Sequence, residues 1–206
     1  MSGSRMGSMK SVSSVAGVLA LSAALLWPLA ANASRVVAGV TFDDHCEVAG
    51  QSLVLNGAGV RVKLIIKVYA MALYLPDRDR SVRNVLAQSG PKSVHIALLR
   101  DVRANDLSEA LVKGMVSNLS DRDLLPMQSR LDELHAALLA AGDAKKGELI
   151  QLDYLPGAGS RITIDGKPLG KDIPGEDFYQ ALLKIWLGEK ASDNSLKSDL
   201  LGASSR

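Results

Sequence analysis

Cysteine and aromatic residues are scarce in this chain of 206 residues. The single cysteine, Cys46, excludes an intrachain disulfide even in an oxidising compartment. Aromatic residues make up 4% of the chain, too few for the rows of stacking rings that bind single-stranded nucleic acid. Hydrophobic residues at 47% and charged residues at 22% are typical of a folded globular chain, and the length suits one domain or two small ones.

The first 33 residues have the three-part pattern of a secretory signal peptide. Arg5 and Lys10 precede an apolar run over residues 15–31, which ends in the small-x-small pattern Ala31-Asn32-Ala33. The alternative is an uncleaved membrane anchor, but the most apolar part is shorter than the ~20 residues of a spanning helix, and Pro28 interrupts the run. We therefore predict a signal peptide over residues 1–33 and a periplasmic or secreted protein.

No charge of one sign dominates the remaining residues, 34–206. The leader holds two of the 24 basic residues and none of the 22 acidic ones, so 22 of each remain. The chain therefore has no net field that would recruit nucleic acid or an anionic membrane. It also has no second long apolar run, so we expect no stable membrane insertion after cleavage.

Strand-like and helix-like patterns follow one another in the order strands, a helix pair, strands and a last helix. Strands are expected within residues 35–76 and over 93–100, 148–155 and 160–164, and helices over 78–88, 105–119, 127–141 and 175–188. This order predicts a single α+β domain over residues 34–206, in which helices cover one face of an antiparallel sheet.

Local signals refine this interpretation. Gly50-Gln51 indicates a hairpin, and residues 56–59 indicate a turn or a bulge. The run over residues 60–75 is long for one strand, so it bends or forms a tight hairpin near Val62-Lys63. Asn105 is the expected N-cap of the first long helix, and the polar tail from Ser192 carries leucines that would dock.

Known catalytic and cofactor motifs are missing, so we predict no cofactor and no metal site. Residues 43–46, Asp-Asp-His-Cys, include metal-ligating types, but adjacent side chains of an extended segment point to opposite faces and do not converge on one ion. Residues 56–59 are not a dinucleotide fingerprint, because they open a strand rather than a helix. His95 and His135 fit structural roles better than catalytic ones.

Arg61 and Tyr69 have the most informative spacing. They are eight positions apart, an even number, so both would lie on one face of an extended strand together with Lys63 and Lys67. On a straight strand they would be ~26 Å apart, and they converge on one ligand only if the chain turns back between them. The other interpretation of the spacing is a solvent-facing row of cations covered by Tyr69.

Three segments together resemble the chalcone isomerase family, in particular its bacterial, secreted, chalcone isomerase-like branch. They are Leu55-Asn56-Gly57-Ala58-Gly59-Val60-Arg61, residues 67–75, and residues 175–188 followed by 195–202. The segments occur in the order of the family and span about residues 38–202. The resemblance implies an open-faced β-sandwich, in which a long antiparallel sheet is covered by a helix layer that encloses an apolar cleft.

The resemblance also implies a site. Arg61 stands where the family directs an arginine into the cleft, and Tyr179 stands where the isomerases carry a small hydroxyl residue. Leu107 and Gly114 replace a catalytic tyrosine and asparagine, and their side chains cannot hydrogen-bond a ketone or a hydroxyl. Non-catalytic, fatty-acid-binding members hold a carboxylate with an arginine and a nearby tyrosine, which is similar to Arg61 and Tyr69.

The function implied by this resemblance is binding of a fatty acid or a similar amphipathic carboxylate. Its ligand-binding residues would be Arg61, Tyr69 and Tyr179. Two alternatives stay open: an intramolecular lyase that isomerises a chalcone-like phenolic substrate, and an interaction protein that uses the same scaffold without a small ligand.

Overall fold

The computed structural model describes residues 34–203, and the predicted signal peptide lies outside the described residues. The elements in chain order are β1 (Ser34–Val37), β2 (Val40–Asp43), β3 (His45–Val48), β4 (Gln51–Lys63), β5 (Ile66–Leu75), α1 (Val82–Ala87), β6 (Lys92–Leu98), α2 (Ala104–Val116), α3 (Asp121–Leu124), the short 3₁₀ helix η1 (Leu125–Met127), α4 (Gln128–Ala141), β7 (Leu149–Leu155), β8 (Gly159–Ile164), β9 (Lys167–Pro168), α5 (Glu176–Leu187) and α6 (Asn194–Leu200). None of these helices is long and apolar enough to cross a membrane.

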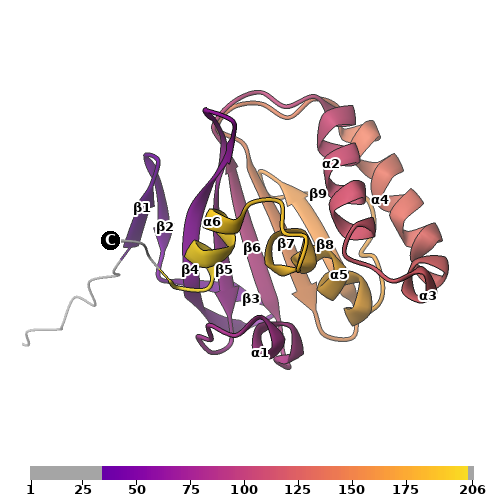
Figure 1. Cartoon of the computed structure of the whole chain (residues 1–206), viewed down its shortest axis with the longest axis horizontal. Coiled ribbons are helices and arrows are strands. Elements are labelled where there is room, and N and C mark those ends of the chain that lie inside the picture. The colour runs from indigo at the N-terminus through magenta and orange to yellow at the C-terminus, as the bar shows by residue number, and fades with distance from the viewer. Residues whose placement is uncertain (1–33, 204–206) are drawn as a thin grey trace, which may run out of the picture. The chain divides into compact units, whose positions relative to one another are not determined.

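Seven antiparallel strands form the main sheet, and their spatial order, β3-β4-β5-β6-β7-β8-β9, follows the chain (Figure 1). Helix α1 connects β5 to β6, and the segment from α2 to α4 connects β6 to β7. The other strands are joined by turns, including the predicted hairpin at Gly50 and a second hairpin at Asp165-Gly166. The structure thus confirms the predicted α+β class, with an antiparallel sheet and a helix layer.

The two faces of the sheet carry separate cores. On one face, alternate strand residues such as Ile96, Leu98 and Ile150 pack with buried residues of α2, α4, α5 and α6. On the other face, Phe42 of the β1–β2 hairpin joins a smaller cluster with Leu53, Tyr74 and others. Successive side chains of a strand point to opposite faces, so the same strand contributes residues to both clusters. Both cores lie within residues 34–203, so this segment contains what an independently folding domain needs.

Helix α6 lies directly on β4 because two glycines leave room for it. A Cβ at Gly57 would lie 2.1 Å from the carbonyl oxygen of Asp199, and one at Gly59 would lie 2.6 Å from the Asp199 Cβ. Leu196 and Leu200 of α6 are completely buried there, which confirms the predicted docking of the tail. Residues 56–59 therefore form no turn that leaves the sheet.

The predicted bulge is present at Asn56, where the β4–β5 register shifts between Leu55 and Gly57. The Asn56 side chain is buried, and both ends of its amide are hydrogen-bonded. Its amide nitrogen donates to the Leu200 carbonyl at 2.7 Å, and its amide oxygen accepts the Asp79 backbone N–H at 2.8 Å. The bulge thus links β4 to both α6 and the segment before α1.

Two predicted helix starts were wrong. Helix α1 begins at Val82 instead of Arg78, because the Asp79 carboxylate accepts the Ser81 N–H in a local turn. Helix α2 begins at Ala104, so Asn105 is not its N-cap. The Ala104 N–H instead donates to the carboxylate of Asp143, which comes from the distant α4–β7 connection. Tertiary contacts thus replace the local cap that the sequence suggested.

Candidate functional site

The hairpin of β4 and β5 brings Arg61 and Tyr69 together. The chain turns back at residues 64–65, and Arg61 and Tyr69 are direct cross-strand partners. Directly opposed residues present their side chains on the same face of a sheet, which here is the helix-covered face. Tyr69 is in turn paired with Leu98 of β6. The chain therefore turns back between the two residues, as their convergence on one ligand requires. Arg61 and Tyr69 do not lie far apart on one straight strand.

A cavity of about 560 Å³ lies between the sheet and the helices, with Arg61 and Tyr69 among its lining residues. Its aliphatic and aromatic lining comes from β6, β7 and β8 (Ile96, Leu98, Ile150, Leu152, Ile162), from α2 and α4 (Leu107, Ala110, Leu111, Leu138), and from α5 (Ile185, Trp186). Charged residues, including Lys63, Arg100 and Glu109, also line it. This volume falls within the range of pockets that hold small molecules, roughly 300–1,000 Å³.

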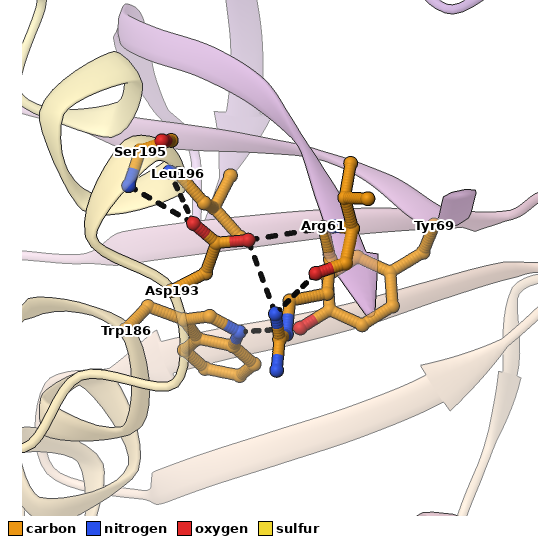
Figure 2. A network of polar contacts seen from close by, with 7 residues as sticks. Arg61, Tyr69, Trp186, Asp193, Ser195 and Leu196 are labelled. Carbon is orange, nitrogen blue, oxygen red and sulfur yellow. Dashed lines mark hydrogen bonds and ion pairs between the residues drawn. The ribbon is translucent and has the colours of Figure 1, made fainter. Parts of the chain in front are cut away.

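The Arg61 guanidinium is paired on one side. Its Nη1 donates to the Val62 carbonyl at 2.7 Å and to a carboxylate oxygen of Asp193 at 3.1 Å (Figure 2). Asp193 is the N-cap of α6, and its second oxygen accepts the backbone N–H groups of Ser195 and Leu196. One carboxylate therefore holds both the start of α6 and the arginine.

The electrostatics of this pair are consistent with a permanent charge on Asp193. Partial burial alone would raise the pKa of its carboxyl group, but the N–H groups of Leu196 and Val62 and the Arg61 guanidinium outweigh that effect. The pKa of Asp193 is therefore lowered, and the carboxylate stays ionised at neutral pH.

The other side of the Arg61 guanidinium is open. Its Nε and Nη2 donate no hydrogen bond to any of residues 34–203, and 22% of the side chain is exposed. An arginine that is half-buried at a cavity with unused N–H groups can accept a second anion in a two-pronged geometry. The arrangement can thus hold a carboxylate without breaking the contact with Asp193.

Tyr69 is fixed by Trp186. The indole Nε1 donates to the Tyr69 hydroxyl oxygen at 2.8 Å, which leaves the hydroxyl hydrogen for donation. Burial raises the pKa of Tyr69, and the hydrogen bond from Trp186 and the charge of Arg61 offset this only in part. The phenol is therefore a neutral donor at physiological pH, beside the guanidinium (Figure 2).

Tyr179 lies apart from Arg61 and Tyr69. It is buried in α5, its hydroxyl donates to the Leu152 carbonyl at 2.9 Å, and it is not among the residues that line the cavity. The structure therefore brings two of the three predicted ligand-binding residues together. The third has a hydroxyl that is already used in helix–sheet packing.

Two residues of the site, Asp193 and Trp186, were not identified from the sequence. Asp193 precedes Asn194-Ser195-Leu196, and an acidic or Asn/Ser residue ahead of an apolar helical residue is an N-cap signal that would have marked the start of α6. Trp186 lies within the helix predicted over residues 175–188, but no pattern in the sequence marked it as a residue of the site. Its hydrogen bond to Tyr69 joins residues 117 positions apart, and no local pattern indicates it.

The other candidate residues have structural surroundings. Ser108 and His135 are hydrogen-bonded to each other at 2.6 Å between α2 and α4 and do not line the cavity. Burial raises the pKa of the Cys46 thiol to about 12, so it is not a reactive thiolate. Within residues 34–203, no three His, Cys, Asp or Glu side chains are placed to hold a metal ion.

An apolar cavity between an antiparallel sheet and a helix layer, with a guanidinium and a phenol at one wall, defines an α+β domain built around a ligand-sized cavity. Residues 34–202 match the family model described as chalcone isomerase-like. The chain therefore belongs to the chalcone isomerase-like family. None of the curated proteins matches the chain.

Among solved structures, the chain is similar to the crystal structure of a fatty-acid binding protein of Arabidopsis thaliana. The two share 16% sequence identity with a TM-score of 0.67, and the match covers 82% of this chain and 96% of that chain. At this identity the likeness establishes a shared fold.

Proposed function

We propose that this protein is a non-catalytic binding protein for a fatty acid or a similar amphipathic carboxylate. The observation that carries the proposal is the apolar cavity of about 560 Å³ with the open side of the Arg61 guanidinium in its wall. We further propose that residues 1–33 direct the protein to the periplasm or outside the cell, in keeping with their signal-peptide pattern.

The chemistry of such a ligand matches the two parts of the site. The aliphatic lining from β6, β7, β8 and the helices offers an apolar tail a place out of water, at roughly 25 cal/mol per Å² of buried apolar surface. The unused N–H groups of Arg61 match the two oxygens of a carboxylate, and the Tyr69 hydroxyl adds a third donor. The similar fold of the plant fatty-acid binding protein supports this proposal.

The cavity wall favours binding over isomerisation. Leu107 lines the cavity where the resemblance implies a catalytic tyrosine, and Gly114 faces Ile185 of α5 instead of the cavity. Neither side chain can donate a hydrogen bond to a developing oxyanion. An interaction protein without a small ligand would pair Arg61 internally, as observed with Asp193, but would also fill the cleft with its own side chains, which is not observed.

Replacing Arg61 should weaken carboxylate binding. We expect Arg61→Ala to lower the affinity for a long-chain fatty acid such as palmitate by about tenfold, because charge-assisted hydrogen bonds to the carboxylate are lost. Calorimetric titration measures this change, and mass spectrometry of denatured protein identifies lipid that co-purifies with the wild type.

Arg161→Ala is the matched control, because Arg161 also pairs with an aspartate, Asp172, but does not line the cavity. Its affinity should equal that of the wild type. The proposal fails if the wild type purifies without lipid and binds no fatty acid. Turnover of a chalcone, followed by absorbance and abolished in Arg61→Ala, would support the lyase instead.

Asp193→Asn should strengthen binding, because the asparagine oxygen can still accept the Arg61 hydrogen bond and orient the guanidinium, while the negative charge that repels a ligand carboxylate is removed. Asparagine is as good an N-cap as aspartate, so α6 should keep its start. We expect a roughly fivefold gain in fatty-acid affinity, measured by the same titration. This gain corresponds to a binding free energy on the order of that of one hydrogen bond. A loss of affinity would show that the charge of Asp193 is needed to orient the guanidinium and that its repulsion of the ligand carboxylate is unimportant.

A further inference from the structure

The turn between β4 and β5 exposes bulky aliphatic side chains. Leu64 and Ile65, the two residues of the turn, are both 93% exposed, and Ile66 beside them is also exposed. Single exposed apolar residues are ordinary on protein surfaces, but two adjacent and almost fully exposed ones at a hairpin tip form a convex apolar point. We call residues 64–66 the hairpin tip.

The backbone of the hairpin tip is also unusual for its sequence. Leu64 has a φ of +59°, in the left-handed region where two-residue hairpin turns favour glycine, asparagine or aspartate. A leucine there is strained relative to glycine, because its Cβ crowds the following carbonyl oxygen. The backbone conformation of the turn therefore gives no reason for a leucine at this position. The feature that remains to be explained is the exposed apolar side chain.

Basic residues surround the hairpin tip. Lys63 and Lys67 flank it in sequence, and both are exposed. Arg100 lies on the β6–α2 connection, which reaches the same end of the sheet (Figure 1). Within residues 34–203, none of these three cations forms an ion pair, whereas Asp101 near them is bound to Lys145 and Asp106 to Arg103. These three cations are therefore not neutralised by direct ion pairs, although the total charge of the chain is nearly balanced.

The hairpin tip adjoins the cavity. Lys63 and Arg100 line the cavity, and Arg61 lies two residues before Lys63 on β4. A surface that the tip contacts would therefore lie next to the polar residues of the cavity wall. An amphipathic ligand that leaves or enters past these residues would meet that surface.

We propose that the hairpin tip docks the protein on an anionic lipid bilayer, with Leu64, Ile65 and Ile66 in the boundary between headgroups and acyl chains. Lys63, Lys67 and Arg100 then contact the anionic headgroups. Aliphatic residues combined with cations are the pattern of peripheral membrane binding, which differs from stable insertion. The docking proposal depends only on the residues of the hairpin tip and the cations beside it. A role of this docking in ligand exchange depends in addition on the proposed function.

A protein partner fits this surface less well. A stable protein interface buries about 800 Å² on each partner, and a convex turn of two residues flanked by lysines offers far less. Shallow membrane binding needs only a few aliphatic side chains and nearby cations. The size and the charge of the tip therefore favour a lipid surface.

Vesicle co-sedimentation tests the proposal, using the chain from Ser34 to Arg206, which contains the whole described fold. We expect partition into phosphatidylcholine vesicles that contain phosphatidylglycerol, and weaker partition into phosphatidylcholine alone. Ile65→Ser should reduce the partition by about tenfold through lost apolar contact. Lys67→Ser should reduce it about fivefold, and only on the anionic vesicles.

Leu125→Ser is the matched control, because Leu125 is 82% exposed but lies on η1, away from the tip. It should bind vesicles like the wild type. Docking by the tip is overturned if the wild type does not bind vesicles, or if Leu125→Ser and Ile65→Ser lose vesicle binding equally. It is also overturned if the wild type binds no vesicles but self-associates, and Ile65→Ser abolishes that self-association. Ile65→Ser should bind palmitate in solution like the wild type, so failure of docking and failure of ligand binding are told apart.

Discussion

Gly57→Ala is expected to lower the free energy of unfolding by about 4 kcal/mol, although it adds only a methyl group. The new Cβ would lie 2.1 Å from the Asp199 carbonyl oxygen and 2.6 Å from that of Leu200, so the backbone of α6 must move away from β4. This movement loosens the packing of Leu196 and Leu200, both completely buried. Loss of such packing at two leucines is worth several kcal/mol, which chemical denaturation measures.

Gly50→Ala is the control for this prediction. Gly50 has open space around it, so an added methyl group meets only the cost of its positive φ, about 1 kcal/mol. Combining Gly57→Ala with Leu200→Ala should cost less than the sum of the two single changes, since both act on the same helix–strand contact. A Gly57→Ala protein within 1 kcal/mol of the wild type would contradict close packing of α6 on β4.

The displacement of α6 should also reach the binding site. Asp193, the N-cap of α6, holds one side of the Arg61 guanidinium, and Gly57, Gly59 and Arg61 lie along the same strand. If α6 moves, Arg61 loses the partner that orients it. Fatty-acid affinity of the folded Gly57→Ala protein should therefore fall as well, in a titration below its unfolding temperature.

Acidification from pH 7 to pH 5 should lower the free energy of unfolding by about 2 kcal/mol through His95. Burial lowers the pKa of His95 from its ordinary value of 6.5 to about 4, and the nearby Asp43 offsets this only in part. Between these two values the unfolded chain binds a proton that the native protein does not. Stability is therefore complete above pH 6.5 and falls as the pH decreases toward 4.

The surroundings of His95 explain the shift. It lies on the sheet face opposite the cavity, with its ring centroid 4.7 Å from that of Tyr74. The Gln151 amide nitrogen is 3.2 Å from Nε2, a contact that only an unprotonated nitrogen can accept. Urea denaturation at pH 7 and at pH 5 measures the effect, and His95→Gln should remove most of the difference. An equal loss in this variant would assign the pH dependence to other groups.

The fold class could be predicted because hydrophobic periodicity is a local property. Alternation over residues 149–155 and the apolar face of residues 176–187 each follow from neighbouring residues, and both elements are present. Helix boundaries were less predictable where the ends are satisfied from a distance, as at Ala104, whose N–H is bound by Asp143. Residues 56–59 suggested a turn because a glycine can mark either a turn or a place where another backbone approaches a strand closely. Only the packing of α6 on β4 shows which of the two applies here.

The periodicity of apolar residues is local, so the sequence alone was enough to predict the apolar segments that build the sheet and its helix cover. That Arg61 and Tyr69 share a face follows instead from their cross-strand pairing in the β4–β5 hairpin, where the register shifts between Arg61 and Val62. Only the folding of the whole chain brings distant groups to these two residues: Asp193 pairs with Arg61 across 132 positions, and Trp186 binds Tyr69 across 117. The physical reason is the range of each effect. Side-chain direction depends on the local backbone, whereas a hydrogen bond between α6 and β4 exists only after Gly57 and Gly59 have let the helix settle on the strand.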